Sequence, residues 1–320
     1  MIRKRPHAET ALTSRLCDLL DEDTQADEHL AYSLEHLNRD LSQGDGLARL
    51  SCQVETHEYT PDIEGWVTQS DLGFIINYHD YLLPEESWSA AWLPQAKRLT
   101  PNLHSSSLYT EASKFSAVDA EQQERIGKLR KAVGIEFIKY LLYCPRPAAL
   151  DVETRAKLAH LRYKNLASEI FDYTLGLETR DDLSANDSTL AAGIFITGID
   201  DLPHNLASVH STILGGSCPL SWFFAAHFAG GIRRGGLVNA PARVRIRPGE
   251  TTPDFAPRPL GKVELAHAIV RGHPVALERL RETLDIPQDR RIRVLPPHTL
   301  TIDVRIGSDF NDNTRQIRLQ

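Results

Sequence analysis

The sequence of 320 residues contains no long hydrophobic run: no stretch approaches the 18 or more apolar residues that a membrane-spanning helix needs. Its first residues, Met-Ile-Arg-Lys-Arg-Pro-His, are basic but lead into a polar helix, not into the apolar core of a secretory signal. We therefore expect a cytoplasmic protein without a membrane partner. Hydrophobic residues make up 41% of the chain and charged residues 25%, which is ordinary for a globular protein with a sizeable core.

Cysteine is scarce, and the metal and nucleophile motifs that rely on cysteine, histidine or serine are missing. The four cysteines lie far apart and form no C-x-x-C pair, so they indicate neither a structural zinc site nor a disulfide framework. The thirteen histidines show no H-x-x-x-H or H-E-x-x-H spacing, and no serine stands in a G-x-S-x-G elbow. We interpret the cysteines as buried, reduced thiols: Cys17, Cys52, Cys144 and Cys218.

The net charge of −7 argues against a protein that coats nucleic acid indiscriminately. The charge is uneven, however, because residues 221–320 carry 16 Lys and Arg against 10 Asp and Glu. Arginines alternate along one predicted strand, and two more lie in the glycine-rich loop 230–236; either set could grip phosphates, although a solvated basic face is the competing interpretation. These candidate nucleic-acid contacts are Arg243, Arg245, Arg247, Arg233 and Arg234.

The N-terminal half alternates between helical and strand patterns. Leucines at helical spacing predict a helix over residues 7–21, with Glu9 one turn before the buried stripe. Three strands follow as a meander, then a helix over 118–133 and a strand over 136–143 that stops at a proline pair. The three strands span residues 48–59, 71–78 and 89–99.

The second half is less regular. Helices are predicted over 152–173, 219–228, 262–270 and 274–284, and strands over 191–199, 242–247, 291–295 and 300–306. The whole chain therefore has an α/β (α+β) pattern.

Two polar side chains occupy one face of the third strand. Residues i and i+2 share a strand face, so Gln95 and Lys97 project together. If the second and third strands form a hairpin centred near Pro84, Asp71 pairs with Lys97, because both lie 13 residues from the centre. Asp71, Gln95 and Lys97 then meet at one end of the hairpin.

This grouping suits metal-assisted hydrolysis of a phosphodiester. The Asp71 carboxylate and the Gln95 amide oxygen can bind a hard cation such as Mg²⁺ or Mn²⁺. Lys97 can orient the nucleophile and offset developing negative charge. Glu9, on the helix that must pack against this sheet, is the best placed further metal ligand by topology.

The arrangement of these residues resembles a known family. A helix with Glu9, a strand that starts Gln-Ser-Asp-Leu-Gly, a strand that ends Gln-Ala-Lys-Arg-Leu, a helix and a strand are similar to the PD-(D/E)xK restriction-endonuclease-like superfamily. Gln95 in place of an acid resembles its QxK branch, typified by Mrr-type restriction enzymes. The resemblance covers roughly residues 8–145. It implies a mixed central sheet flanked by helices and a metal-dependent nuclease acting through Asp71, Gln95 and Lys97, with Glu9 as the helix acid.

From this resemblance we expect residues 1–150 to form the nuclease core. Residues 151–320 would then form a C-terminal α/β extension that completes the sheet or adds a subdomain contacting nucleic acid. The expected activity is cleavage of phosphodiester bonds in DNA, in restriction or anti-phage defence. The alternative is a non-catalytic nucleic-acid-binding or assembly module on the same fold. Nucleases that cut both strands often work as dimers, which leaves a homodimer open.

Competing interpretations accompany each candidate. Lys and Pro protect exposed sheet edges, so Gln95 and Lys97 could belong to an edge strand. Glu9 could simply complement the helix dipole. Pro94 removes a ladder donor from the third strand, which predicts a bulge or an unpaired amide there. Three further acids could assist the metal: Glu55, Glu58 and Glu64.

Overall fold

The computed structural model describes a large part of the chain. The described residues are 7–25, 30, 32–43, 50–58, 70–102, 108–117, 119–168, 193–200, 202–213, 215–228, 243–255, 260–284 and 296–307.

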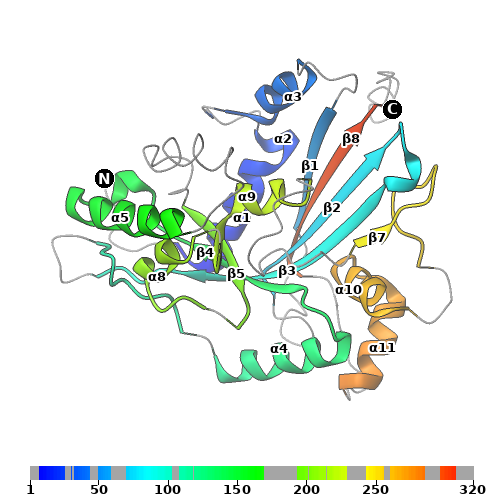
Figure 1. The fold of residues 1–320 in the computed structure, drawn as a ribbon. Coiled ribbons are helices and arrows are strands. Elements are labelled where there is room, and N and C mark those ends of the chain that lie inside the picture. Colours follow the sequence, from blue (N-terminus) through cyan, green and yellow to red (C-terminus); the bar gives the residue numbers. More distant parts are fainter. Residues whose placement is uncertain are drawn as a thin grey trace.

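A mixed sheet runs through the middle of the molecule (Figure 1). Its eight described strands have the order β1-β8-β2-β3-β4-β5-β6, and β7 pairs with the start of β3. β8 is parallel to β2, β3 is parallel to β4, and the remaining neighbours are antiparallel. The strands are β1 (Leu50–Glu58), β2 (Leu72–Asp80), β3 (Trp88–Arg98), β4 (Ile138–Tyr143), β5 (Ile194–Gly198), β6 (Ser217–Pro219), β7 (Arg243–Arg245) and β8 (His298–Ile306).

Helices cover both faces of the sheet (Figure 1). On one face lie α1 (Glu9–Leu20), α2 (Glu22–Gln25), α3 (Leu34–Ser42) and α9 (Leu220–Ala225). On the other lie α4 (Ala120–Val133), α5 (Val152–Ser168), α8 (Leu206–Ser211), α10 (Lys262–Val270) and α11 (Pro274–Leu284). Short 3₁₀ turns occur at Pro84–Glu86 and Pro147–Ala149.

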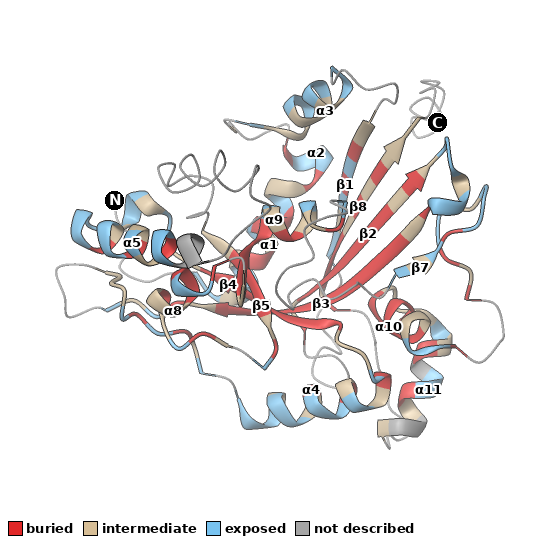
Figure 2. Cartoon of the chain, viewed as in Figure 1, coloured by how far each residue is buried: buried red, intermediate tan, exposed pale blue. Residues whose placement is uncertain are grey.

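Each face of the sheet has its own hydrophobic core, and the central strands β2, β3 and β4 are almost entirely buried (Figure 2). On β3 the even-numbered residues Trp92 and Ala96 face the α1 side, while Ala91 and Leu93 face the α4 and α10 side. A strand covered on both faces reads as a continuous apolar run, which explains why β3 shows little alternation.

The architecture is therefore α/β, as predicted, but the predicted meander is wrong. β8, from near the C-terminal end of the described chain, inserts between β1 and β2 and pairs with both. Strands from residues 1–150 and from 151–320 thus belong to one sheet. The β2–β3 hairpin, in contrast, is confirmed.

Most predicted elements are present with small boundary changes. α10 and α11 have the predicted bounds, and α1, α4 and β4 begin within two residues of prediction. The predicted strand 291–295 lies outside the described residues. None of the helices in the described ranges combines the length and the apolar character that crossing a bilayer requires.

Candidate active site at the end of the hairpin

The register of the hairpin differs from the prediction by two residues. Asn77 pairs with Ser89 and Phe74 with Trp92, so the hairpin is centred on residue 83. The same register continued to the end of the hairpin sets Asp71 opposite Gln95. The predicted pairing of Asp71 with Lys97 is therefore wrong, although all three residues still belong to this end of the hairpin.

The Asp71 carboxylate completes the hydrogen bonding of β3 beyond Pro94. The amides of Leu93 and Leu99 donate to carbonyls on the β4 side, so the intervening even-numbered residues direct their amides toward β2. Pro94 has no amide to donate. Two residues further on, the amide of Ala96 donates to Oδ2 of Asp71 at 2.8 Å. β3 has no bulge at Pro94 against β4, with which it stays in register on both sides of the proline.

Glu9 also accepts a backbone amide of β3, two residues beyond the amide that Asp71 accepts. Its Oε1 accepts the backbone amide of Arg98 at 3.1 Å and the hydroxyl of Ser116 at 2.5 Å. Because β3 rises about 3.3 Å per residue, the amides that bind Asp71 and Glu9 are about 7 Å apart. Two carboxylates from distant parts of the chain therefore lie side by side along one edge of β3.

Gln95 is buried against Asp71, with 3% of its surface exposed. Its Nε2 donates to Oδ2 of Asp71, while its Oε1 is buried without a hydrogen-bond partner. Ser70, next to Asp71 in the chain, also buries a hydroxyl oxygen without a partner. Unsatisfied buried acceptors are rare in native proteins and commonly indicate a water molecule or an ion.

Lys97 is also buried, with 4% of its surface exposed. Its Nζ donates to the side-chain oxygen of Gln122 in α4 at 2.9 Å, and within the described chain it forms no ion pair. β3 lies between β2 and β4 and both side chains are buried, so the interpretation of Gln95 and Lys97 as residues of an exposed edge strand is wrong. Burying an ammonium without a charged partner is costly, so this placement of Lys97 is consistent with a functional role.

Tyr143, at the end of β4, lies in the electric field of both carboxylates. Burial raises the pKa of its hydroxyl above the usual range, and the charges of Asp71 and Glu9 raise it further. The hydroxyl donates to Oγ1 of Thr13 in α1 at 3.0 Å. Tyr143 is therefore a protonated hydrogen-bond donor that ties α1 to the sheet.

The oxygen atoms at this end of the hairpin fit a hard divalent cation. Asp71 supplies a carboxylate, and the unsatisfied Gln95 Oε1 supplies a neutral oxygen that needs a positive partner. Within the described residues, no three His, Cys, Asp or Glu side chains are grouped so that they could hold a metal ion. Any cation here would therefore depend on the Gln95 amide in addition to carboxylates.

The other described acids predicted as metal ligands lie two strands away from β2. Glu58 is at the same end of the sheet as Asp71, because Glu58 and Leu72 both pair with His298. Glu55 and Glu58 are exposed on β1, which β8 separates from β2. Glu55 contacts His57 at 3.6 Å. Glu64 lies outside the described residues.

The predicted phosphate-binding arginines are not brought to this site. β7 pairs with residues 88–90 of β3, at the opposite end of the hairpin. Arg243 stacks on Trp88 with 4.1 Å to the ring centroid, Arg245 donates to the Glu85 carbonyl at 2.8 Å, and Arg247 pairs with an aspartate at 3.0 Å. Arg233 and Arg234 lie outside the described residues.

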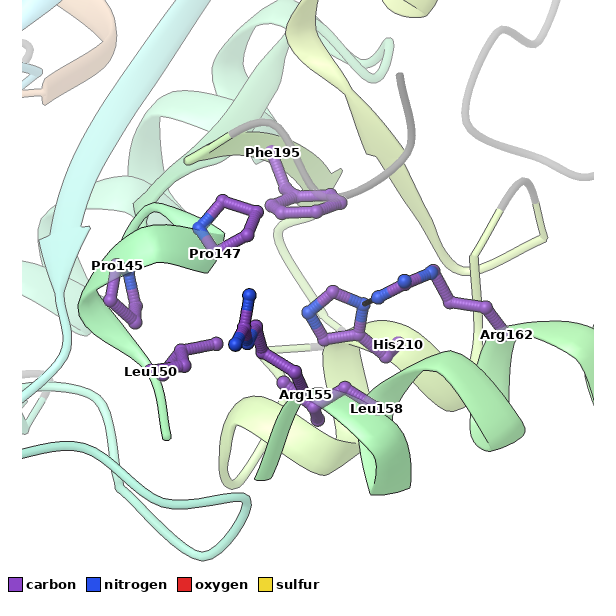
Figure 3. Close-up of a pocket in the computed structure, with 8 residues that line it drawn as sticks. All are labelled: Pro145, Pro147, Leu150, Arg155, Leu158, Arg162, Phe195 and His210. Carbon is purple, nitrogen blue, oxygen red and sulfur yellow. Dashed lines mark hydrogen bonds between the residues drawn. The ribbon is translucent and has the colours of Figure 1, made fainter. Parts of the chain in front are cut away.

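A small cavity beyond β4, between α5 and α8, contains a second cluster of polar groups (Figure 3). Arg155 points into it, and Arg162 donates to Nδ1 of His210 at 3.2 Å. Burial, with the nearby charge of Arg162, lowers the pKa of His210 to about 3, so this histidine is neutral near pH 7. The cavity volume of about 10 Å³ holds roughly one water molecule, which is too small for a substrate.

Sequence reasoning missed the residues that support the site. Gln122 contacts Lys97 across 25 positions, and Ser116 contacts Glu9 across 107. No local pattern reports such contacts. The amphipathic spacing of α4 does predict which of its faces meets the sheet, so Gln122 could have been shortlisted as a polar residue in its first turns.

Comparisons of the chain with protein-family models, with curated proteins and with solved structures find no match.

Proposed function

We propose that this protein is a metal-dependent nuclease that hydrolyses phosphodiester bonds, with DNA as its substrate and restriction or anti-phage defence as its setting. The observation that carries the proposal is the Gln95 amide: its nitrogen binds Asp71, and its buried oxygen is left without a donor beside that carboxylate. A divalent cation would satisfy this oxygen and the Asp71 charge together.

The order of the elements supports a restriction-endonuclease-like core. α1, β1, β2, β3, α4 and β4 follow one another as helix, three strands, helix and strand; among the residues described between α1 and β1, the helices are the short α2 and α3. β3 and β4 are parallel, and α1 and α4 cover opposite faces. β8 is an addition to the pattern, because it separates β1 from β2.

The side chains divide the chemistry among them. Asp71 and Gln95 would hold a Mg²⁺ or Mn²⁺ ion, with Glu9 next along the strand edge. When bound, such an ion polarises a phosphodiester and makes water a stronger acid. Lys97, whose buried ammonium is held by Gln122, would stabilise the negative charge that develops on the phosphoryl oxygens. Gln122 is a positioning residue, since it acts by holding the Lys97 Nζ.

A second candidate function is a non-catalytic nucleic-acid-binding or assembly module. It is favoured by the hydrogen bonds of the two acids, since Asp71 and Glu9 both accept backbone amides of β3 and would stabilise the sheet without any metal. In that case the carboxylates are structural, and Gln95 Oε1 would be satisfied by an ordered water.

Titration with Mn²⁺, followed by calorimetry, separates the two candidates. The nuclease proposal expects one site per chain in the wild type, and at least a tenfold loss of affinity in Asp71→Asn and in Gln95→Leu. Glu124→Gln, on the exposed side of α4, is the matched control and should bind like the wild type. A wild type that binds no Mn²⁺, or an Asp71→Asn variant with undiminished affinity, favours the non-catalytic module.

A further inference from the structure

An open groove of about 590 Å³ lies between α1, α9 and the carboxyl ends of β3 and β4. Its floor is apolar and includes Leu12, Leu16 and Leu19 of α1, and Leu220 and Phe224 of α9. The volume falls within the range of roughly 300–1,000 Å³ that is typical of ligand sites. We call this feature the arginine groove, because three arginines line it: Arg15, Arg98 and Arg146.

The charge of the arginine groove has one sign. No Asp or Glu is among the described residues that line it, whereas Arg15 and Arg146 are exposed and Arg98 is half-buried. The chain as a whole is acidic at −7, so a purely basic lining is a local departure from its composition. Basic clefts with apolar walls attract anions and concentrate them.

The arginine groove lies on the α1 face of the sheet, next to the two carboxylates of the candidate site, whereas Lys97 projects toward α4 on the opposite face. Arg98 follows Lys97 in β3, its amide binds Glu9, and its side chain lines the groove. Tyr143 lines the groove as well, and the charges of Asp71 and Glu9 reach its hydroxyl. A phosphate held at Arg98 would therefore lie beside the edge of β3 where the two carboxylates are placed.

We infer that the arginine groove binds an unpaired nucleotide of a nucleic-acid substrate, with the base on the leucine floor and the flanking phosphates on the arginines. This inference deepens the proposed nuclease function and rests on it for the identity of the ligand. An unpaired base can bury its flat faces on apolar side chains without first breaking a base pair and leaving its stack. A base within a duplex must first be flipped out, so the groove should favour unpaired nucleotides. The substrate is thus a single strand, or a duplex with an unpaired end or flap.

Fluorescence anisotropy tests this inference without any cleavage. The probes are a labelled 15-nucleotide single strand, as DNA and as RNA, and the blunt DNA duplex of the same sequence, all in EDTA. We expect at least tenfold tighter binding of one of the single strands than of the duplex. Equal affinities, tighter duplex binding or no binding of any probe would overturn the inference.

Two groove variants and a control locate the binding. Ser221 is an exposed α9 residue that lines the groove, and Ser221→Trp should fill it and weaken single-strand binding at least tenfold. Arg146→Gln should weaken binding severalfold and reduce the slope of log affinity against log salt by about one. Arg279→Gln, on the exposed surface of α11, should bind like the wild type.

The outcomes distinguish this inference from the proposed function. Single-strand binding that both groove variants weaken supports the groove even if no cleavage is ever detected. If Ser221→Trp fails to fold, as judged by circular dichroism, Arg146→Gln decides alone. Metal-dependent cleavage by the wild type, together with unchanged single-strand binding by the groove variants, would overturn the inference that the arginine groove binds the nucleotide. The nuclease proposal would remain unaffected.

Discussion

The carboxylate of Asp71 accepts the backbone amide of Ala96 at 2.8 Å, two residues beyond the proline that interrupts the hydrogen-bond ladder of β3. The proline and the aspartate act together. Because Pro94 cannot donate to β2, the strand edge beyond it is open to side chains, and Asp71 and then Glu9 take the amides that a neighbouring strand would otherwise bind. The candidate site is built where the hairpin ladder stops.

Lys97→Met should abolish cleavage without unfolding the protein. Methionine keeps the apolar stem, and removing a buried charge that lacks an ion pair in the described chain should leave the free energy of unfolding unchanged or raise it. We expect at least a hundredfold loss of cleavage rate, measured beside a urea denaturation curve. A variant that cuts like the wild type would remove Lys97 from the mechanism.

Gln95→Glu should make the protein dependent on divalent cations for stability. The new carboxylate would contact Asp71, which raises the pKa of one of the two above its unfolded value. The penalty is therefore absent at low pH and appears as pH rises through the raised pKa. Differential scanning fluorimetry at pH 7.5 should show a melting temperature several degrees below wild type that Mg²⁺ restores. Gln123→Glu, on the exposed face of α4, should show neither effect.

Glu9→Gln separates a structural role from a metal-binding role. The glutamine amide oxygen can accept the same two hydrogen bonds, from the Arg98 amide and the Ser116 hydroxyl, so stability should change by less than about 1 kcal/mol. We expect Mn²⁺ affinity to fall about tenfold, because a neutral oxygen replaces a charged ligand. Unchanged Mn²⁺ affinity would show that Glu9 is not a metal ligand and only stabilises the edge of β3 through the Arg98 amide.

The buried His227 should make the protein lose folding stability as the pH falls into the mildly acidic range. Burial lowers the pKa of His227 to about 4, and its Nε2 accepts the indole N–H of Trp92 at 2.9 Å. The unfolded chain binds this proton near pH 6.5, so the stabilisation is complete above that pH and is lost as pH falls toward 4. The free energy of unfolding should fall by up to about 1.4 kcal/mol per pH unit for this group in that window. Urea denaturation of His227→Gln, which keeps an acceptor for Trp92, should show a shallower pH dependence; an unchanged slope would exclude His227 as its source.

Much of the site could be predicted from the sequence because it lies on one hairpin. The strand pattern locates β2 and β3, and the i, i+2 spacing puts Gln95 and Lys97 on one face. The register is less accessible, since it depends on how the turn is built. The 3₁₀ turn at Pro84–Glu86 belongs to the β3 side of the turn, which moves the centre to residue 83 and exchanges Lys97 for Gln95 as the residue opposite Asp71.

The insertion of β8 could not be predicted from local patterns. The alternation of apolar and polar residues identifies β8 as a strand. Its partners β1 and β2 lie more than 200 residues earlier, and the residue pattern of a strand does not indicate which distant strand it will pair with. The same limit applies to Gln122 and Ser116, which support the site through side-chain contacts between elements.

Cleavage by the wild type and by Asp71→Asn tests the central claim most directly. Both the Ala96 amide and the Gln95 Nε2 donate to Oδ2 of Asp71, and an asparagine oxygen in that position can accept both bonds, so the fold should be retained. The measurement is the rate of cleavage of a labelled DNA, as single strand and as duplex, with Mg²⁺, with Mn²⁺ and with EDTA. The predicted result is metal-dependent cleavage by the wild type and at least a hundredfold slower cleavage by a folded Asp71→Asn. Equal rates for the two proteins, or wild-type cleavage that persists in EDTA, would contradict the account.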